Sequence, residues 1–323
     1  MEVCWQVKVL MIGRSRSIAF DDLKKYWGEV DFARPPHIPI KKYDLVIGQE
    51  PTPRIGIPAY LIAKLMGAKL VLEVHADYLQ SALSPMQRLI ARYLLRRCDM
   101  VRAVSRKIER DLRELGIMKV SMIPSIYIKT NLFRPLKPHS SRDPIILSVG
   151  RLVEQKNFPM LLKAFKIVKE NLPEARLVIV GRGPLEPEIR DLVKKLELSS
   201  CFALIKQWLS EKELIKIYND AAVLAVTSRY EGGPRVAFEA GACQTPFVST
   251  HVGILAETAK DGVHGFFVAN VEEFAEKMIT LLQNPEMRER MGETFRKMIA
   301  EKFEWDHVVR LYAKSYLRFS RDP

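Results

Sequence analysis

The stretch Ser228-Arg-Tyr-Glu-Gly-Gly-Pro-Arg-Val-Ala-Phe-Glu-Ala-Gly241 directly follows a short apolar run, Val223-Leu-Ala-Val226. The apolar run is typical of a buried strand. Pro234 favours the start of a helix, because its ring presets the first helical φ and it lacks only an N–H that would be unpaired there. This part of the chain therefore predicts a strand, a glycine-containing loop and a helix. Repeats of such a unit are typical of parallel sheets covered by helices on both faces.

Short apolar runs alternate with amphipathic stretches through the rest of the chain. The predicted strands are Val7–Ile12, Leu45–Ile47, Lys69–Val74, Met100–Val104, Ser121–Ile123, Ile145–Val149, Ala175–Val180, Phe202–Lys206, Val223–Thr227, Pro246–Ser249 and Gly265–Val268. Helical patterns lie between them, for example over 159–171, 185–196 and 210–220. A chain of 323 residues is about right for two domains. We therefore expect two doubly wound, Rossmann-like α/β domains.

A proline-rich polar segment, Phe133–Pro144, is the best candidate for the linker between the domains. The charge balance changes at the same place. Residues 1–140 hold 24 Lys and Arg against 13 Asp and Glu, whereas residues 141–323 hold 27 against 25. The first half thus carries a surplus of +11 and the second a surplus of +2, which together give the net +13 of the chain. We expect domains at 1–140 and 141–302.

Two glutamates eight positions apart, Glu231 and Glu239, bracket the glycine loop. Backbone can approach a ligand closely at glycine, and a helix start offers unpaired N–H groups to an anion. The stretch resembles the Glu-x7-Glu motif of glycosyltransferase family 4, whose members are retaining enzymes that use nucleotide sugars. The resemblance implies that Glu231 contacts the donor sugar, that Glu239 holds the ribose, and that the loop meets the diphosphate. The loop residues concerned are Gly232, Gly233, Pro234, Arg235 and Val236. The plainer alternative is a surface loop with two solvated glutamates.

The same resemblance implies the GT-B fold, in which two doubly wound domains face a cleft. In relatives a C-terminal helix crosses back to the first domain, and residues 303–323, which are helical in pattern, would be that helix. The resemblance is firm over about 145–270 and weak before residue 70. The acceptor therefore cannot be carried over from the family.

Two further glycine loops follow predicted strands in the second half. Gly150-Arg-Leu precedes Lys156 and resembles a family element whose Arg and Lys hold the donor diphosphate, which implies that role for Arg151 and Lys156. Fixed cations at this place would stabilise the charge that grows on the leaving group. Gly181 and Gly183 resemble the family's Val-Gly-x-Gly-Pro near the nucleotide, although a structural turn is nearly as good an interpretation. The alternative for Arg151 and Lys156 is a pair of solvated surface cations.

His75 directly follows the predicted strand Lys69–Val74. It resembles a histidine that relatives use beside the donor sugar, which makes it a candidate catalytic residue. A structural histidine at a strand end is the alternative. No cofactor and no metal are expected, because Arg151 and Lys156 would supply the counter-charge and the chain shows no convincing Asp-x-Asp site.

Basic residues recur at helical spacing in the first half, at Arg88, Arg92 and Arg96 and again at Arg106, Arg110 and Arg113. Such helices can lie on an anionic membrane surface. A solvated basic face is an equally good interpretation. No stretch approaches the length of a membrane span, and four scattered cysteines indicate a reducing compartment. We therefore expect a cytoplasmic protein, and peripheral docking on the membrane is one of the two interpretations of its basic face.

The sequence predicts a retaining, metal-independent glycosyltransferase whose donor is a nucleotide sugar. Its acceptor is not identified by the sequence; a lipid-linked or otherwise anionic acceptor is the candidate. A nucleotide-sugar epimerase of the same fold is one alternative. An inactive, membrane-associated subunit that binds a sugar nucleotide is another. The sequence pI of about 9.5 would suit a nucleic-acid-binding protein. Nucleic acid is nevertheless not expected as a partner, because the sequence contains no recognised nucleic-acid-binding motif.

Overall fold

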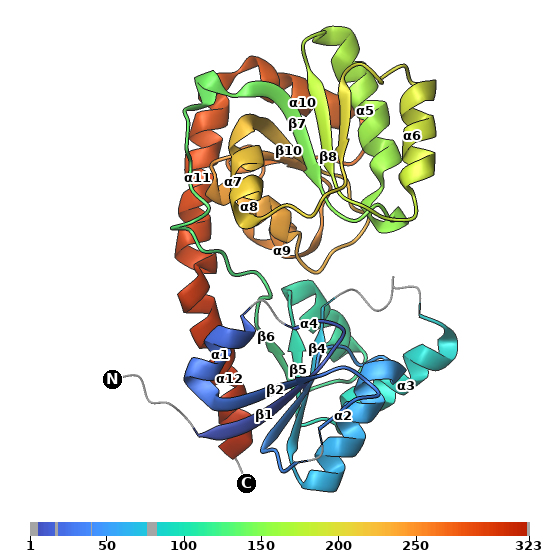
Figure 1. Cartoon of the computed structure of the whole chain (residues 1–323), viewed down its shortest axis with the longest axis vertical. Coiled ribbons are helices and arrows are strands. Elements are labelled where there is room, and N and C mark those ends of the chain that lie inside the picture. The colour runs from blue at the N-terminus through green and yellow to red at the C-terminus, as the bar shows by residue number, and fades with distance from the viewer. Residues whose placement is uncertain (1–5, 17–18, 40, 76–82, 322–323) are drawn as a thin grey trace. The chain divides into compact units, whose positions relative to one another are not determined.

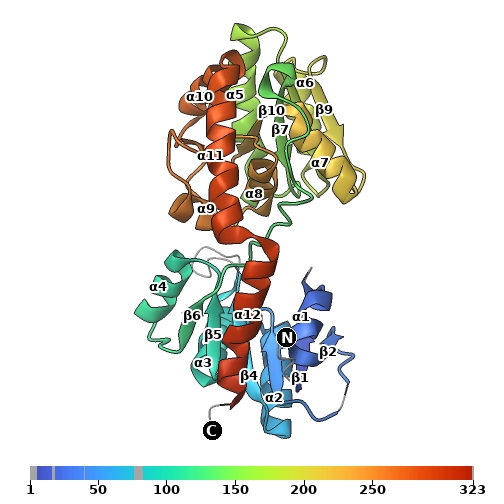
Figure 2. The same cartoon turned by 90° about the vertical axis from the view of Figure 1, so that its left-hand side faces the viewer.

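The computed structural model describes residues 6–16, 19–39, 41–75 and 83–321. The chain divides into two compact units. Unit 1 comprises Met1–Tyr127 together with Asp306–Pro323, and unit 2 comprises Ile128–Trp305. Each unit is a parallel sheet with helices packed on both faces, as Figure 1 and Figure 2 show from two directions.

Strands and helices alternate through most of unit 1, as expected for a doubly wound sheet, and the third strand follows the second directly. They are β1 (Val7–Ile12), α1 (Phe20–Trp27), β2 (Gly28–Ala33), β3 (Leu45–Gly48), α2 (Pro53–Met66), β4 (Lys69–Val74), α3 (Pro85–Arg97), β5 (Met100–Ala103), α4 (Arg106–Glu114), β6 (Val120–Met122) and, at the end of the chain, α12 (Trp305–Arg321). The six strands are ordered β2-β1-β3-β4-β5-β6. The strand order therefore reverses between β1 and β3.

Unit 2 repeats this architecture with a different strand order. Its elements are η1 (His139–Ser141), β7 (Asp143–Val149), η2 (Glu154–Lys156), α5 (Phe158–Asn171), β8 (Arg176–Val180), α6 (Glu186–Lys195), β9 (Phe202–Ile205), α7 (Glu211–Asp220), β10 (Ala221–Val226), α8 (Arg235–Ala242), β11 (Phe247–Ser249), α9 (Gly253–Thr258), β12 (Gly265–Phe267), α10 (Val271–Gln283) and α11 (Pro285–Phe303). The order β12-β11-β10-β7-β8-β9 reverses between β7 and β10. Open α/β sheets bind ligands at such a reversal, at the carboxyl ends of the strands.

The expected fold class, two doubly wound parallel sheets, is confirmed. Every strand predicted from the sequence is present, because central strands buried on both faces read as continuous apolar runs. The sequence analysis missed α1 and β2. Strand β2 lies at the edge of its sheet, pairs with β1 alone among the described strands, and carries the charged residues Glu29 and Asp31.

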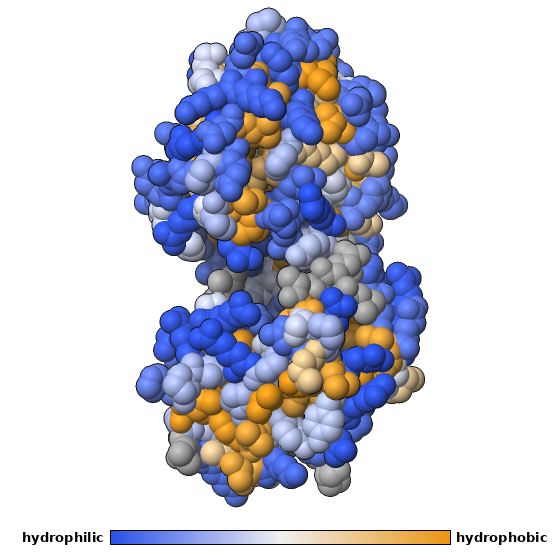
Figure 3. Space-filling view, turned by 90° about the vertical axis from the view of Figure 1, so that its right-hand side faces the viewer, coloured by the Kyte–Doolittle hydropathy of each residue, from blue (hydrophilic) through white to orange (hydrophobic). Residues whose placement is uncertain are grey.

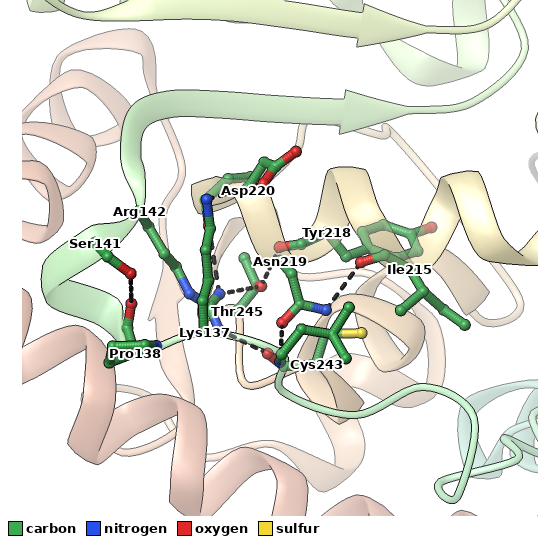
Figure 4. Close-up of polar contacts among 12 residues, drawn as sticks. Lys137, Pro138, Ser141, Arg142, Ile215, Tyr218, Asn219, Asp220, Cys243 and Thr245 are labelled. Carbon is green, nitrogen blue, oxygen red and sulfur yellow. Dashed lines mark hydrogen bonds and ion pairs between the residues drawn. The ribbon is translucent and has the colours of Figure 1, made fainter.

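The segment expected to be a linker, Phe133–Pro144, lies within unit 2 rather than between the units. Its backbone is held by Asn219, whose side chain accepts from Leu136 N at 2.7 Å and donates to the Arg134 carbonyl at 3.0 Å. Lys137 forms an ion pair with Asp220 at 2.8 Å. Figure 4 shows Asn219 and Asp220 at the end of α7, with Lys137 beside them. The units instead divide between Tyr127 and Ile128, about a dozen residues earlier than expected.

Buried arginines hold the ends of helices in unit 2. The Arg142 guanidinium donates to Thr245 Oγ1 at 2.7 Å and to the Cys243 carbonyl, at the end of α8, at 2.9 Å (Figure 4). Arg288 donates to the Leu281 and Leu282 carbonyls at the end of α10. A cation at a helix C-terminus satisfies carbonyls that have no partner within the helix and lies at the negative end of its dipole.

The last helical stretch differs from the expectation of one continuous helix over 303–323. Helix α11 ends at Phe303, Glu304 is extended, and α12 begins at Trp305. The break is fixed by backbone bonds between Ile128 N and the Phe303 carbonyl and between Trp305 N and the Ile128 carbonyl. From Asp306 onward the helix belongs to unit 1, where Tyr312 and Tyr316 pack against Trp27.

Candidate functional site

The candidate residues of unit 2 follow the carboxyl ends of β7, β8 and β10, in the loops there and in α8, the helix after β10. Strands β7 and β10 are neighbours, with Val223 opposite Ile146 and Leu224 opposite Leu147. The loops that follow them therefore meet at the reversal of strand order. Arg229 N donates to the Gln155 carbonyl at 2.8 Å and Gln155 Nε2 donates to the Tyr230 carbonyl at 2.7 Å, which ties the two loops together.

Lys156 and Glu231 form an ion pair across these two loops. Ser228 Oγ also donates to Glu231 Oε1, at 2.9 Å. The stem of Lys156 lies against Gly150, where a Cβ would come within 3.1 Å of Lys156 Cε. Both side chains are largely buried, with exposed fractions of 18% for Lys156 and 11% for Glu231. The structure thus brings Lys156 and Glu231 together and holds both in fixed positions.

Gly181 and Gly183 must lack a side chain, because the loops after β7 and β8 approach each other closely there. A Cβ on Gly181 would lie 1.9 Å from the Gly150 carbonyl oxygen, and one on Gly183 would lie 2.4 Å from that of Leu152. The loops after β7 and β8 are joined by bonds such as Leu152 N to the Arg182 carbonyl, at 3.0 Å. The structural-turn interpretation accounts for both glycines through these contacts.

A pocket of about 410 Å³ opens beside these loops. Its lining combines cationic and apolar groups: Val149, Gly150, Arg151, Val180, Gly181, Arg182, Lys206, Gln207, Trp208, Leu209 and Leu214. Arg151 is exposed at one side. The Trp208 side chain, which the sequence analysis did not single out, is 85% exposed although it is large and apolar. An exposed aromatic face beside cationic side chains suits a ligand that has a flat ring and an anionic group.

Glu239 lies on α8 and is buried, with both carboxylate oxygens engaged. Oε1 accepts from Arg235 Nε at 2.8 Å and Oε2 accepts from the Tyr218 hydroxyl at 2.9 Å. Burial raises the pKa of Tyr218 well above its usual value, and the negative charge of Glu239 raises it further. Tyr218 was missed from the sequence because no local pattern places α7 beside α8. The two contacts therefore hold the Glu239 carboxylate in a fixed direction.

The loop between Glu231 and α8 is packed rather than extended into solvent. Gly232 and Pro234 are buried, and Gly233, Arg235 and Val236 are half-buried. The Gly232 carbonyl accepts from Ile254 N at 3.1 Å, and a Cβ on Gly253 would lie 2.5 Å from that oxygen. Helix α8 begins at Arg235, one residue later than Pro234 predicted. The helix start and the glycine backbone lie beside Glu231, as the sequence indicated.

His75 belongs to unit 1, directly after β4. Its Nε2 lies 2.8 Å from Glu73 Oε2. Glu73 is 2% exposed and also contacts Arg102, Tyr312 and Tyr316. Burial alone would raise the pKa of Glu73, but Arg102 and the contact with His75 outweigh it and hold that pKa well below its usual range. The sequence analysis missed this carboxylate.

The described residues include neither a candidate metal site nor a candidate membrane span. No group of three or more His, Cys, Asp or Glu side chains there has an arrangement that could hold a metal ion. No helix in the described part of the chain is both long and apolar enough to cross a membrane.

Two family models match the chain. The model of the glycosyl transferases group 1 matches residues 130–298, and that of the glycosyl transferase 4-like domain matches residues 31–125. The first covers more than half of the chain and lies over the Lys156 and Glu231 loops. The chain therefore belongs to the glycosyl transferases group 1 family, as the sequence motifs indicated.

Individual proteins agree with this assignment. An uncharacterized glycosyltransferase of Methanocaldococcus jannaschii is 33% identical over 54% of this chain and 48% of its own length. N-acetyl-alpha-D-glucosaminyl L-malate synthase of Bacillus anthracis is 27% identical over 83% of this chain and 73% of its own length. The chain thus matches about half the length of the first of these relatives.

Among solved structures, Alr3699/HepE of Anabaena in complex with UDP is similar, with a TM-score of 0.80 and 16% identity. The similarity covers 96% of this chain and 100% of that one. At this identity the likeness establishes the fold, which is the GT-B fold of two doubly wound domains.

Proposed function

We propose that this chain is a retaining glycosyltransferase that moves a sugar from a nucleoside-diphosphate sugar to an acceptor. The observation that carries the proposal is the Lys156–Glu231 pair at the strand-order reversal of unit 2, beside the pocket lined by Arg151 and Trp208. In this proposal Glu231 orients the sugar, Lys156 and Arg151 face the diphosphate, and Glu239 receives the ribose hydroxyls. His75 of unit 1 is the proposed catalytic histidine.

In this proposal Lys156 and Arg151 stabilise the leaving diphosphate. When the glycosidic bond to the diphosphate breaks, negative charge grows on the leaving group. Lys156 is fixed by Glu231 and by packing on Gly150, so little reorganisation is needed when that charge appears. Because two cations are available for this work, we propose that transfer needs no divalent metal. The leaving phosphate would accept the proton of the acceptor hydroxyl, and no carboxylate nucleophile is proposed.

A UDP-sugar is a reasonable first donor to test. The Anabaena protein of similar fold was solved with UDP and with UDP-glucose. Comparing UDP-, GDP- and ADP-sugars by thermal shift identifies the base that this chain prefers. A ligand present at 100 times its Kd stabilises the folded state by about 2.7 kcal/mol, which is measurable as a rise in Tm.

The decisive variant is Glu239→Ala. We expect it to abolish the Tm rise with the best donor, whereas Glu301→Ala, an exposed glutamate of α11, should keep it. A rise that survived Glu239→Ala unchanged would contradict the ribose assignment. Transfer itself is measured by product NMR, where the anomeric signal should keep the donor's configuration, and activity should persist in EDTA.

Product analysis also separates the alternatives. An epimerase would convert the donor with no acceptor present, and an inactive binding subunit would bind the donor and release no product. Transfer that depends on an added acceptor supports the proposal over both.

We further propose that α3 docks unit 1 on an anionic bilayer and brings it to a lipid-linked or otherwise anionic acceptor. Helix α3 carries Arg88, Arg92, Arg96 and Arg97 and no acidic residue. Large apolar side chains are exposed beside them: Leu61, Leu65, Met86, Leu89 and Tyr93. Figure 3 shows apolar and hydrophilic residues side by side on the face of this unit that carries α3. Apolar side chains flanked by arginines suit the boundary between headgroups and acyl chains.

The second basic stripe is a weaker candidate for this contact. On α4, Arg113 pairs with Glu109 at 2.9 Å and Lys107 pairs with Asp111 at 2.6 Å, so much of its charge is compensated locally. Co-sedimentation with liposomes tests the proposal. Recovery should require anionic lipid, should fall at raised salt, and should fall in Leu89→Ser but not in Leu136→Ser, an exposed leucine of unit 2. Equal recovery with neutral and anionic liposomes would overturn it.

A further inference from the structure

Glu73 is a carboxylate in the core of unit 1, and its position needs a reason. It lies on β4 with an exposed fraction of 2%. Moving a carboxylate out of water is costly, and a buried ion pair replaced by apolar residues of similar volume often leaves a protein equally stable or more stable. Stability alone therefore does not explain a glutamate at this position.

The two oxygens of Glu73 have different partners. Oε1 accepts from Arg102 Nη1 at 3.0 Å and from the hydroxyls of Tyr312 and Tyr316, both at 2.6 Å. Oε2 faces His75 Nε2 at 2.8 Å. The two residues are two apart on a strand and its continuation, so their side chains leave the same face of the sheet. Of these four partners, only His75 is substantially exposed, with 39% of its side chain accessible.

The donors at Oε1 are themselves held firmly. Arg102 also donates to the Ile123 carbonyl at 2.9 Å and to the Pro124 carbonyl at 2.6 Å, and its guanidinium lies 4.2 Å from the centre of the Tyr312 ring. The Tyr316 ring is stacked on Trp27 at 5.9 Å. Oε1 is thus committed to three fixed donors, and the carboxylate cannot turn to exchange its oxygens.

We propose that Glu73 is a positioning residue that fixes the ring of His75 with its proton on Nε2 and its Nδ1 lone pair directed away from the core. An ionised carboxylate can only accept hydrogen bonds, so the ring nitrogen that faces it must be the donor. The neutral ring then presents Nδ1 as an acceptor for a sugar hydroxyl. This inference rests on the proposed function for the role of His75, but the tautomer it assigns can be observed independently of any activity.

The substitution Glu73→Gln makes a sharp test. The amide oxygen of the introduced side chain should stay with Arg102 and the two tyrosines, because all three are donors. The amide NH2 then faces His75 and can only donate, so the ring nitrogen opposite it must accept. Glu73→Gln should therefore reverse the neutral tautomer, and the proton should move from Nε2 to Nδ1.

The measurement is NMR of the full chain labelled with ring-15N histidine. The chain has six histidines, and the His75 signals are assigned by their loss in His75→Gln. The wild-type spectrum is recorded at a pH at which the His75 signals are those of the neutral ring. It should show a protonated Nε2. The matched control is Tyr316→Phe, which removes a donor to Oε1, leaves Oε2 untouched and should keep the wild-type tautomer. A wild-type ring protonated at Nδ1 would overturn the inference even if Glu73→Gln did not fold.

Folded Glu73→Gln with the wild-type tautomer would overturn it equally. Kinetics add a second readout, because the wrong tautomer should lower kcat/KM for transfer by roughly 10²-fold or more while the Kd of the donor diphosphate changes little. If the tautomers behave as stated and the wild-type chain transfers no sugar, the positioning of His75 stands and the proposed function fails.

Discussion

Lys156 and Glu231 are 75 positions apart in the chain, yet their side chains form an ion pair between the loops that follow β7 and β10. The contact exists because the two strands are neighbours in the sheet, and it lies where strand order reverses. An ion pair between largely buried groups costs more when one partner is lost than a pair on the surface does. Both residues should therefore influence folding as well as catalysis.

Lys156→Met should slow transfer more than it weakens donor binding. It removes the proposed charge-assisted contact to the leaving diphosphate, and such a contact is worth about 1.5–3 kcal/mol. The expected loss in kcat is therefore roughly 10- to 150-fold. Steady-state kinetics and donor titration on the same preparation separate the two effects. Lys163→Met, on the neighbouring helix α5, is the control and should retain full turnover. A full kcat in Lys156→Met would remove Lys156 from the mechanism.

Trp208→Ala should weaken donor binding with little effect on stability. The side chain is 85% exposed, so its removal leaves no cavity in the core. If its ring stacks on the base, each stacked base contributes about 1–3 kcal/mol, and Kd should rise roughly 5- to 150-fold. Isothermal titration with the best donor measures this change. Trp208→Phe keeps an aromatic face and should restore most of the affinity; equal Kd values in all three proteins would show that the ring does not contact the donor.

The free energy of unfolding should decrease as the pH is lowered between the pKa of His139 in the unfolded chain and its pKa in the folded protein. Burial, reinforced by the charges of Arg142 and Arg288, lowers the pKa of His139 to about 3. In the unfolded chain the value is about 6.5. Between these values the unfolded state binds more protons, so the free energy of unfolding decreases as pH falls, by up to about 1.4 kcal/mol per pH unit. Urea unfolding between pH 7 and pH 5 measures the slope.

The comparison for this slope is His139→Leu, which removes the titrating group. The variant should show a flatter dependence over the same range, whereas Ser141→Ala, in the same short helix, should keep the wild-type slope. Identical slopes in His139→Leu and wild type would assign the pH dependence to other groups.

Tyr316→Phe should destabilise unit 1 without changing its packing. The phenylalanine ring can still stack on Trp27, but the hydrogen bond to Glu73 is lost. A hydrogen bond to a charged group contributes about 1.5–3 kcal/mol. Urea denaturation followed by tryptophan fluorescence measures the loss. Lys314→Ala, at an exposed position of α12, should stay within about 0.5 kcal/mol of wild type. A loss equally small in Tyr316→Phe would mean that the hydroxyl adds nothing to stability.

The sequence was informative where structure is local. Each strand of the two sheet centres could be predicted, since burial on both faces requires an apolar run. The glycine loops could be placed because each follows such a run. Edge strand β2 could not, because only two of its six residues are buried and charged residues interrupt its apolar ones. The linker was misplaced for a related reason: Phe133–Pro144 has a loop composition, and its attachment to unit 2 depends on Asn219 and Arg142, which no local pattern reveals.

The candidate site shows the same division. Glu231 and Glu239 could be found from their spacing and the glycines between them, and their assigned roles stay predictions. Tyr218, which fixes Glu239, and Glu73, which faces His75, depend on contacts between segments distant in sequence. Tyr316 contacts Glu73 across 243 positions, and helical periodicity shows only that such a residue is on the apolar side.

Because α12 returns to pack on β4 through Tyr312 and Tyr316, unit 1 is discontinuous in the chain. A fragment that ends at Tyr127 would expose Trp27 and leave a buried carboxylate short of two donors. Attempts to express this half alone should therefore give insoluble material unless a peptide spanning 306–321 is supplied in trans or joined ahead of residue 6 by a circular permutation.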